Sequence, residues 1–139
     1  MSASDHLQSR QLKMFMTARE ITSQYQPADG DRLTKWHGQH EYRPETDDEM
    51  WSRKGVEATN DRVIVGHPSL TAALVADGVK APIPLGREIG RSGKPQVAGG
   101  QHRIAAMMDN KPDELMPVVH HTSIGQAKRY GQHRIMKYT

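Results

Sequence analysis

The sequence of 139 residues contains no cysteine, which excludes disulfide bonds, thiolate zinc sites and a cysteine nucleophile. It has a single phenylalanine and no apolar run long enough to span a bilayer, and its N-terminus lacks the apolar segment of a signal peptide. These absences favour a soluble, cytoplasmic protein without a membrane partner.

The composition indicates one domain with a modest hydrophobic core. Hydrophobic residues make up 35% of the chain and the mean hydropathy is −0.76, so we expect long surface loops or a partner. The net charge is +3 at pH 7, with eight histidines and a pI near 9.3. This mild basicity permits contact with nucleic acid but does not require it, and charge alone favours an ordinary basic surface.

The first sixty residues are predicted to form a helix, a long loop and a second helix. Apolar residues at near-helical spacing predict a helix over 5–25, with a capping box at Ser2 and Asp5. Residues 31–46 are polar and aperiodic, which predicts a long loop through which a protein partner could bind. Acidic residues then favour the start of a helix over 47–57.

The second half alternates strand and helix signals and predicts a small α+β domain with a mixed sheet. The expected strands cover 63–65, 82–85, 96–98 and 115–120, and the expected helices cover 71–76, 101–109 and 124–130. Prolines place 82–85 at a sheet edge, because proline cannot donate to a strand ladder. We therefore divide the chain into an N-terminal extension (1–60), a core (61–130) and a basic tail (131–139).

The segment Gly99-Gly100-Gln101-His102-Arg103 joins a predicted strand directly to a helix. A helix start carries unpaired N–H groups and partial positive charge, which suits an anion, and the glycines can take positive φ and let a ligand approach the backbone. The pattern predicts that the Gly99, Gly100 and Gln101 amides receive a phosphate. Arg103 would supply a permanent charge, and His102 a hydrogen bond or a general acid. The alternative is a solvated first turn behind a tight turn.

The order of elements around this segment resembles the ParB/sulfiredoxin superfamily. The segments that carry the resemblance are Pro82-Ile83-Pro84-Leu85, Gly99 to Arg103 and Met116-Pro117-Val118, within about residues 62 to 130. The resemblance implies the fold of that superfamily and a phosphate pocket at a Gly-x-x-Arg box, here Gly100 to Arg103. Gln101 stands where sulfiredoxins carry their cysteine, so sulfinic-acid reduction by that thiol is excluded.

Within the superfamily, phage and plasmid proteins with a ParB-like nuclease domain are the most similar group. Chromosome-segregation ParB proteins, which bind and hydrolyse CTP, use a second Asn-x-x-Arg box and a long helix-turn-helix region, and we find neither in the sequence. The resemblance leaves open a nuclease or NTP hydrolase with His102 and Arg103 as catalytic residues. Its cofactor would be a nucleoside triphosphate with Mg.

Five further residues are candidate phosphate contacts. Ser69 and Thr71 lie at a predicted helix start, where relatives direct hydroxyls at phosphates, although helix capping explains Ser69 equally well. Arg87, Arg91 and Lys94 surround the turn before the glycines, where they could contact nucleic-acid phosphates or form a solvated turn. We predict no metal site, because the paired histidines lack a supporting carboxylate pattern.

Three functions remain open from the sequence. The first is a module that binds the phosphate of a nucleotide or of DNA, and the second is a nuclease or NTP hydrolase at the same site. The third is a non-catalytic scaffold that binds a protein partner through 31–46, and a homo-oligomer is compatible with each. The lack of a second phosphate box and of paired carboxylates favours the first function. The repeat of Gly100–Ile104 as 131–135 has no assigned role.

Overall fold

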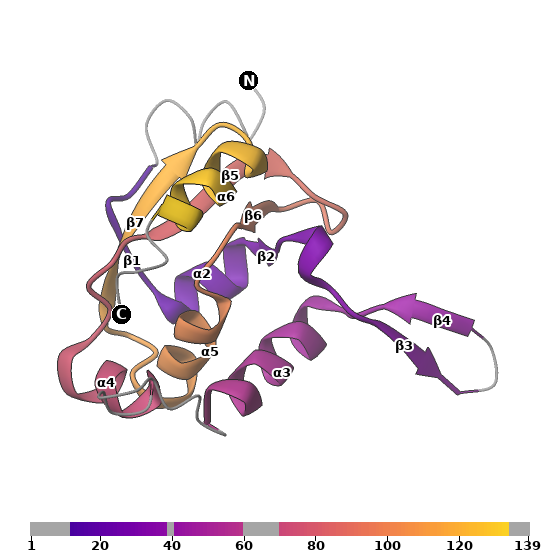
Figure 1. Ribbon diagram of the computed structural model, residues 1–139, viewed down its shortest axis with the longest axis horizontal. Helices are drawn as coiled ribbons and strands as arrows, with labels where there is room; N and C mark the ends of the chain where they lie inside the picture. The colour runs from indigo at the N-terminus through magenta and orange to yellow at the C-terminus, as the bar shows by residue number, and fades with distance from the viewer. Residues whose placement is uncertain (1–11, 39–40, 60–69, 134–139) are drawn as a thin grey trace.

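A computed structural model describes residues 12–38, 41–59 and 70–133 (Figure 1). At its centre is a five-stranded mixed sheet with the strand order β1-β7-β5-β6-β2. The strands are β1 (Phe15–Thr17), β2 (Gln26–Pro27), β5 (Ile83–Ile89), β6 (Pro95–Val97) and β7 (Leu115–His121). β5 is parallel to β7 and antiparallel to β6, β1 is antiparallel to β7, and β2 is parallel to β6. The N-terminal segment therefore supplies both edge strands.

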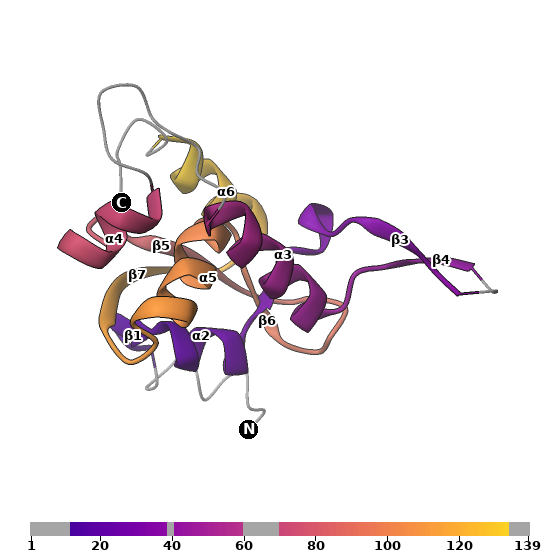
Figure 2. The same cartoon turned by 90° about the horizontal axis from the view of Figure 1, so that it is seen from below.

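Helices cover both faces of this sheet, so the protein has the mixed α+β fold class that the sequence predicts. The helices are α2 (Ala18–Gln24), α3 (Asp47–Thr59), α4 (Leu70–Asp77), α5 (Gln101–Asn110) and α6 (Ile124–His133). Leu85 of β5 is buried with Ile104 of α5. Gly86 points to the opposite face, where a Cβ would lie 3.1 Å from the α-carbon of Ile124 at the start of α6. Figure 2 shows α5 between α2 and α3.

Most elements of the second half are confirmed to within a few residues, as is the helix predicted at 47–57. The helix predicted at 71–76 is α4, which ends before Gly78 at φ 74°. The last helix follows Ser123, whose Oγ accepts the N–H of Gln126 at 3.2 Å. The strand predicted at 63–65 lies outside the described residues.

Of the helix predicted over 5–25, the described part is helical only over Ala18–Gln24 (α2), and the capping box predicted at Ser2 and Asp5 lies outside the described residues. Residues Phe15–Thr17 form β1, which pairs Phe15 with Pro117 and buries Met16. The helix starts only after Thr17, whose Oγ1 accepts the N–H of Glu20 while the Glu20 carboxylate accepts the N–H of Thr17, each at 3.1 Å. This capping box fixes the helix start, and pairing with β7 outweighs the helical spacing before it.

The predicted edge position of 82–85 is also wrong, because β5 is the middle strand of the sheet. Pro84 is compatible with this position because its carbonyl accepts the N–H of Ala98 at 2.9 Å. β6 ends at Val97, so the main-chain N–H that Pro84 lacks falls at the end of the β5–β6 ladder. Proline therefore does not interrupt the middle of this ladder.

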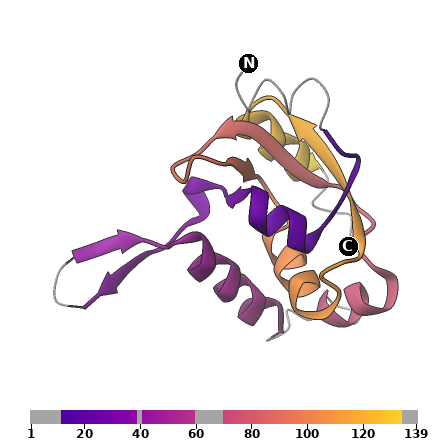
Figure 3. The ribbon, with the colours of Figure 1, turned by 180° about the vertical axis from the view of Figure 1, so that it is seen from behind.

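The long loop predicted over 31–46 is a β-hairpin instead. After a single 3₁₀ turn η1 (Asp29–Asp31), strands β3 (Thr34–His37) and β4 (Glu41–Pro44) pair antiparallel. The hairpin projects away from the sheet and helices (Figures 1 and 3). Trp36 and Tyr42 face each other across it with ring centroids 5.4 Å apart. The strands were missed because neither face is apolar throughout, so no period-two pattern stands out.

Candidate functional site

The two glycines before α5 have different backbone roles. Gly100 is the residue before the helix and has φ 77° and ψ 19°, in the left-handed region. A Cβ at residue 100 would lie 2.8 Å from Cδ1 of Ile83 and 2.9 Å from Nη2 of Arg103. Gly99 is not among the glycines with positive φ. The expectation of positive φ therefore holds for Gly100, where both the backbone and the space require glycine.

Arg103 folds back against Gly100 from the first turn of α5. Its Nη1 donates to the carbonyl oxygen of Ala81 at 2.6 Å, in the loop between α4 and β5. The residue is partly buried, and the loss of solvent around the guanidinium lowers the pKa of Arg103 to about 10. No carboxylate of the described residues forms an ion pair with it. A cation without a counter-ion thus lies at the positive end of a helix, an arrangement that a bound anion would stabilise.

His102 contacts a different element. Its Nε2 lies 2.7 Å from Oε2 of Glu57 on α3, and Glu57 also binds Arg53 and Lys54. Burial opposes ionisation of Glu57, but hydrogen bonds from His102 and Arg53 and the charge of Lys54 outweigh it and hold the pKa of Glu57 at about 2. The two residues predicted to act together, His102 and Arg103, therefore contact different groups: the α3 carboxylate and the Ala81 carbonyl.

The Gln101 side chain is part of the internal structure. Its Nε2 donates to Oδ2 of Asp31 at 2.9 Å and to the carbonyl of Val97 at 3.2 Å, and the residue is buried. These bonds fix the start of α5 against η1 and β6. Only the main chain of Gln101 remains for the ligand role predicted from the sequence.

Thr71 lies at the start of α4, as predicted, but its hydroxyl has an internal partner. Its Oγ1 donates to the carbonyl of Ala58 at 2.8 Å and so links α4 to α3. This bond accounts for Thr71 without a ligand. Ser69 lies outside the described residues.

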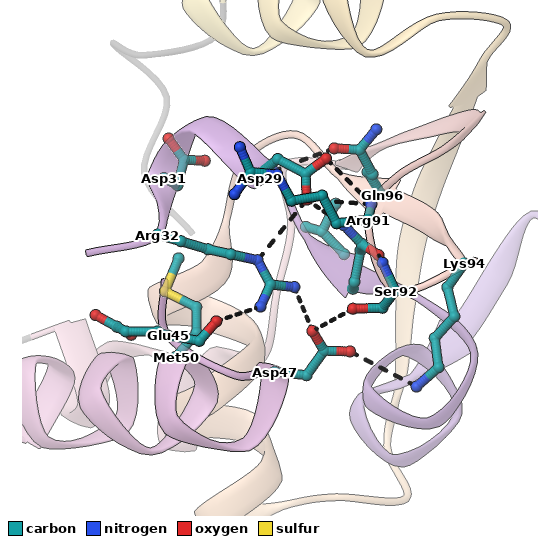
Figure 4. A network of polar contacts seen from close by, with 12 residues as sticks. Asp29, Asp31, Arg32, Glu45, Asp47, Met50, Arg91, Ser92, Lys94 and Gln96 are labelled. Atoms are coloured by element: carbon teal, nitrogen blue, oxygen red, sulfur yellow. Dashed lines mark hydrogen bonds and ion pairs between the residues drawn. The ribbon is translucent and has the colours of Figure 1, made fainter. Parts of the chain in front are cut away.

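The three cations predicted before the glycines do not all lie in the turn. Arg87 belongs to β5, and its buried Nε has no hydrogen-bond partner among the described residues. The main-chain N–H of Arg91 donates to the Asp29 carboxylate at 3.3 Å, and Nζ of Lys94 lies 3.7 Å from Oδ2 of Asp47 (Figure 4). The turn is thus tied to η1 and the start of α3.

Sequence reasoning missed a polar network at the base of the hairpin (Figure 4). Glu45 has a fully buried side chain whose Oε1 lies 2.7 Å from Nε of Arg53. Arg32 donates to the carbonyl of Glu45 at 2.6 Å and forms a close ion pair with Asp47. Ser92 Oγ donates to the same Asp47 carboxylate at 3.1 Å. In the sequence these residues appear only as charges of alternating sign, a pattern that usually indicates a solvated surface and does not reveal a buried ion pair.

A shallow cavity of about 260 Å³ lies between α3 and the end of α5. Its lining comprises Trp51, Ser52, Gly55, Val56, Thr59 and Asp109. None of the predicted site residues lines it. Among the described residues, no three side chains of the types that bind metal ions converge on one point.

No protein-family model, curated protein or solved structure matches this chain. No helix within the described ranges has both the length and the apolar character needed to cross a bilayer.

Proposed function

We infer that this chain is a ParB/sulfiredoxin-like domain that binds a phosphate-bearing ligand, a nucleotide or DNA, at the start of α5. One observation carries the proposal: the partly buried guanidinium of Arg103 lies against Gly100 and has no carboxylate partner among the described residues. A phosphate would supply the missing negative charge and would also accept hydrogen bonds from main-chain N–H groups at the start of α5.

Binding rather than turnover is the proposed activity. His102, the candidate general acid, is hydrogen-bonded to Glu57 at 2.7 Å instead of lying beside Arg103. The proposal therefore assigns Arg103 and the main chain of Gly99 to Gln101 to the ligand, and His102 to the contact between α5 and α3.

Thermal-shift measurements with ATP, CTP, GTP and short DNA test the proposal. At least one of these polyanions should raise the melting temperature of the wild-type protein, and Arg103→Gln should abolish the shift. Arg19→Gln is the matched control, because Arg19 is an exposed arginine of α2 that pairs with Asp113 in the loop between α5 and β7. An equal shift in both variants, or none in the wild type, would contradict the proposal.

A further inference from the structure

The β3–β4 hairpin has two chemically different faces. The register pairs Trp36 with Tyr42 and Thr34 with Pro44, and side chains two residues apart on a strand share a face. One face therefore carries both aromatic rings. The opposite face carries the pair Lys35 and Arg43.

Both rings of the aromatic face are exposed to solvent. Trp36 is 55% exposed and Tyr42 is 69% exposed, and their planes meet at 61°. Their contact stabilises a two-stranded ribbon, which is marginal in isolation. It leaves ring faces uncovered on a hairpin that extends into solvent (Figures 1 and 2).

The opposite face carries charges of both signs, because Glu41 lies on it together with Lys35 and Arg43. Lys35 and Arg43 lie directly across from each other, and like charges at such positions destabilise a strand pair. Arg43 is offset by Glu49, whose Oε1 lies 2.8 Å away. Lys35 has no carboxylate within ion-pair distance in the described part of the chain, so an external anion would relieve the repulsion.

The hairpin is held firmly at its base. Arg32 lies two residues before β3 and Glu45 directly follows β4, and both are tied to α3 by the polar network described above. The main-chain N–H of Glu45 also donates to the carbonyl of Leu33 at 2.8 Å. These contacts orient the exposed rings relative to the body, which reduces the conformational entropy lost on binding.

We propose that the β3–β4 hairpin is a contact site for single-stranded nucleic acid, with Trp36 and Tyr42 stacking on bases and Lys35 contacting a phosphate. Two aromatic rings suffice to stack two unpaired bases, whereas a stable protein interface buries about 800 Å² per partner. Lysine is also depleted at protein interfaces. Stacking requires free base faces, which a duplex offers only at its ends. The site is independent of the one proposed at α5.

Tryptophan fluorescence of the full chain tests this inference directly. Trp51→Phe leaves Trp36 as the single emitter, since the chain has two tryptophans. Titration with oligo(dT) should quench this emission, and a duplex of equal length should bind more weakly. Unchanged emission, or duplex binding as tight as single-strand binding, would overturn the inference.

Variants measured by fluorescence anisotropy of a labelled oligo(dT) separate stacking from charge. Trp36→Ala should weaken binding about tenfold. Phe15→Ala is the control and should leave binding unchanged, because Phe15 is an aromatic residue of β1 that is likewise exposed, at 54%. Trp36→Phe should restore most of the affinity, which distinguishes stacking from loss of the hairpin. Lys35→Gln should reduce the slope of log K against log salt by about 0.7.

Arg103→Gln distinguishes this site from the α5 site. The variant should retain quenching of Trp36 by oligo(dT) even where the nucleotide-induced thermal shift is lost. Equal affinity of Trp36→Ala, Lys35→Gln and wild type for oligo(dT) would contradict the hairpin inference, irrespective of the thermal-shift result at α5.

Discussion

Nη2 of Arg103 lies 2.9 Å from the position that a Cβ on Gly100 would occupy. The glycine provides both the left-handed turn into α5 and the space in which the guanidinium lies. The two residues of the Gly-x-x-Arg box are therefore linked by shape as well as by spacing.

Gly100→Ala should destabilise the protein by about 2 kcal/mol or more. An L-residue at φ 77° costs about 1 kcal/mol, and the new methyl group would overlap Ile83 and Arg103. Urea unfolding measures the loss. Gly93→Ala is the matched control, because Gly93 has φ 75° but nothing within 4 Å of an added Cβ. Equal losses in the two variants would show that the space at Gly100 is not restricted.

Arg103→Met should be neutral or stabilising in the absence of ligand, by up to about 1 kcal/mol. It replaces a partly buried guanidinium, which has no counter-ion among the described residues, with an apolar chain of similar length. Melting temperature in a phosphate-free buffer measures the effect. Arg53→Met should instead destabilise, because it leaves the buried Glu45 carboxylate unpaired. A loss as large at Arg103 as at Arg53 would indicate a structural role for Arg103.

Glu45→Ala should destabilise the protein by about 3 kcal/mol. The carboxylate is fully buried and its removal leaves the Arg53 guanidinium without its closest partner. Asp113→Ala removes an exposed ion pair with Arg19 and should cost clearly less than Glu45→Ala, because solvent screens the pair. Both values come from chemical denaturation. The account of the hairpin base fails if the buried and the exposed pair give the same loss.

The contact between Glu57 and His102 should make a contribution to the free energy of unfolding that depends on pH. The folded-state pKa of Glu57, at about 2, lies below the ordinary value of 4.5, so its contribution is complete above about pH 4.5 and is lost as the pH falls towards 2. The carboxylate is 37% exposed, so solvent limits this contribution to less than about 1 kcal/mol.

A double-mutant cycle over this pH range with Glu57→Gln and His102→Gln measures the coupling energy. It should shrink as the pH falls from 4.5 to 2. A coupling that stays constant, or grows, would contradict the assigned pKa direction.

Local signals predicted the elements around α5 correctly. Gly99-Gly100 followed by an amphipathic stretch identifies the start of α5, and Asp77-Gly78 identifies the end of α4. These features depend on turn and cap chemistry within a few residues, which a sequence displays directly.

The failures concern pairings between distant segments. β1 forms because Phe15–Thr17 lies beside β7, about one hundred residues later, and no local pattern records that. Proline in β5 predicted an edge strand, but β5 is the middle strand. The β5–β6 ladder ends at the position where the proline N–H is missing. The buried Glu45–Arg53 pair and the separate partners of His102 and Arg103 likewise depend on how α3 packs against α5.

The central claim is that an anion binds between Arg103 and the first amides of α5. Backbone amide NMR titration with inorganic triphosphate tests it most directly. The account predicts that the largest shifts occur at Gly100, Gln101 and Arg103, and that they disappear in Arg103→Gln. Shifts confined to other segments, or unchanged shifts in the variant, would contradict it.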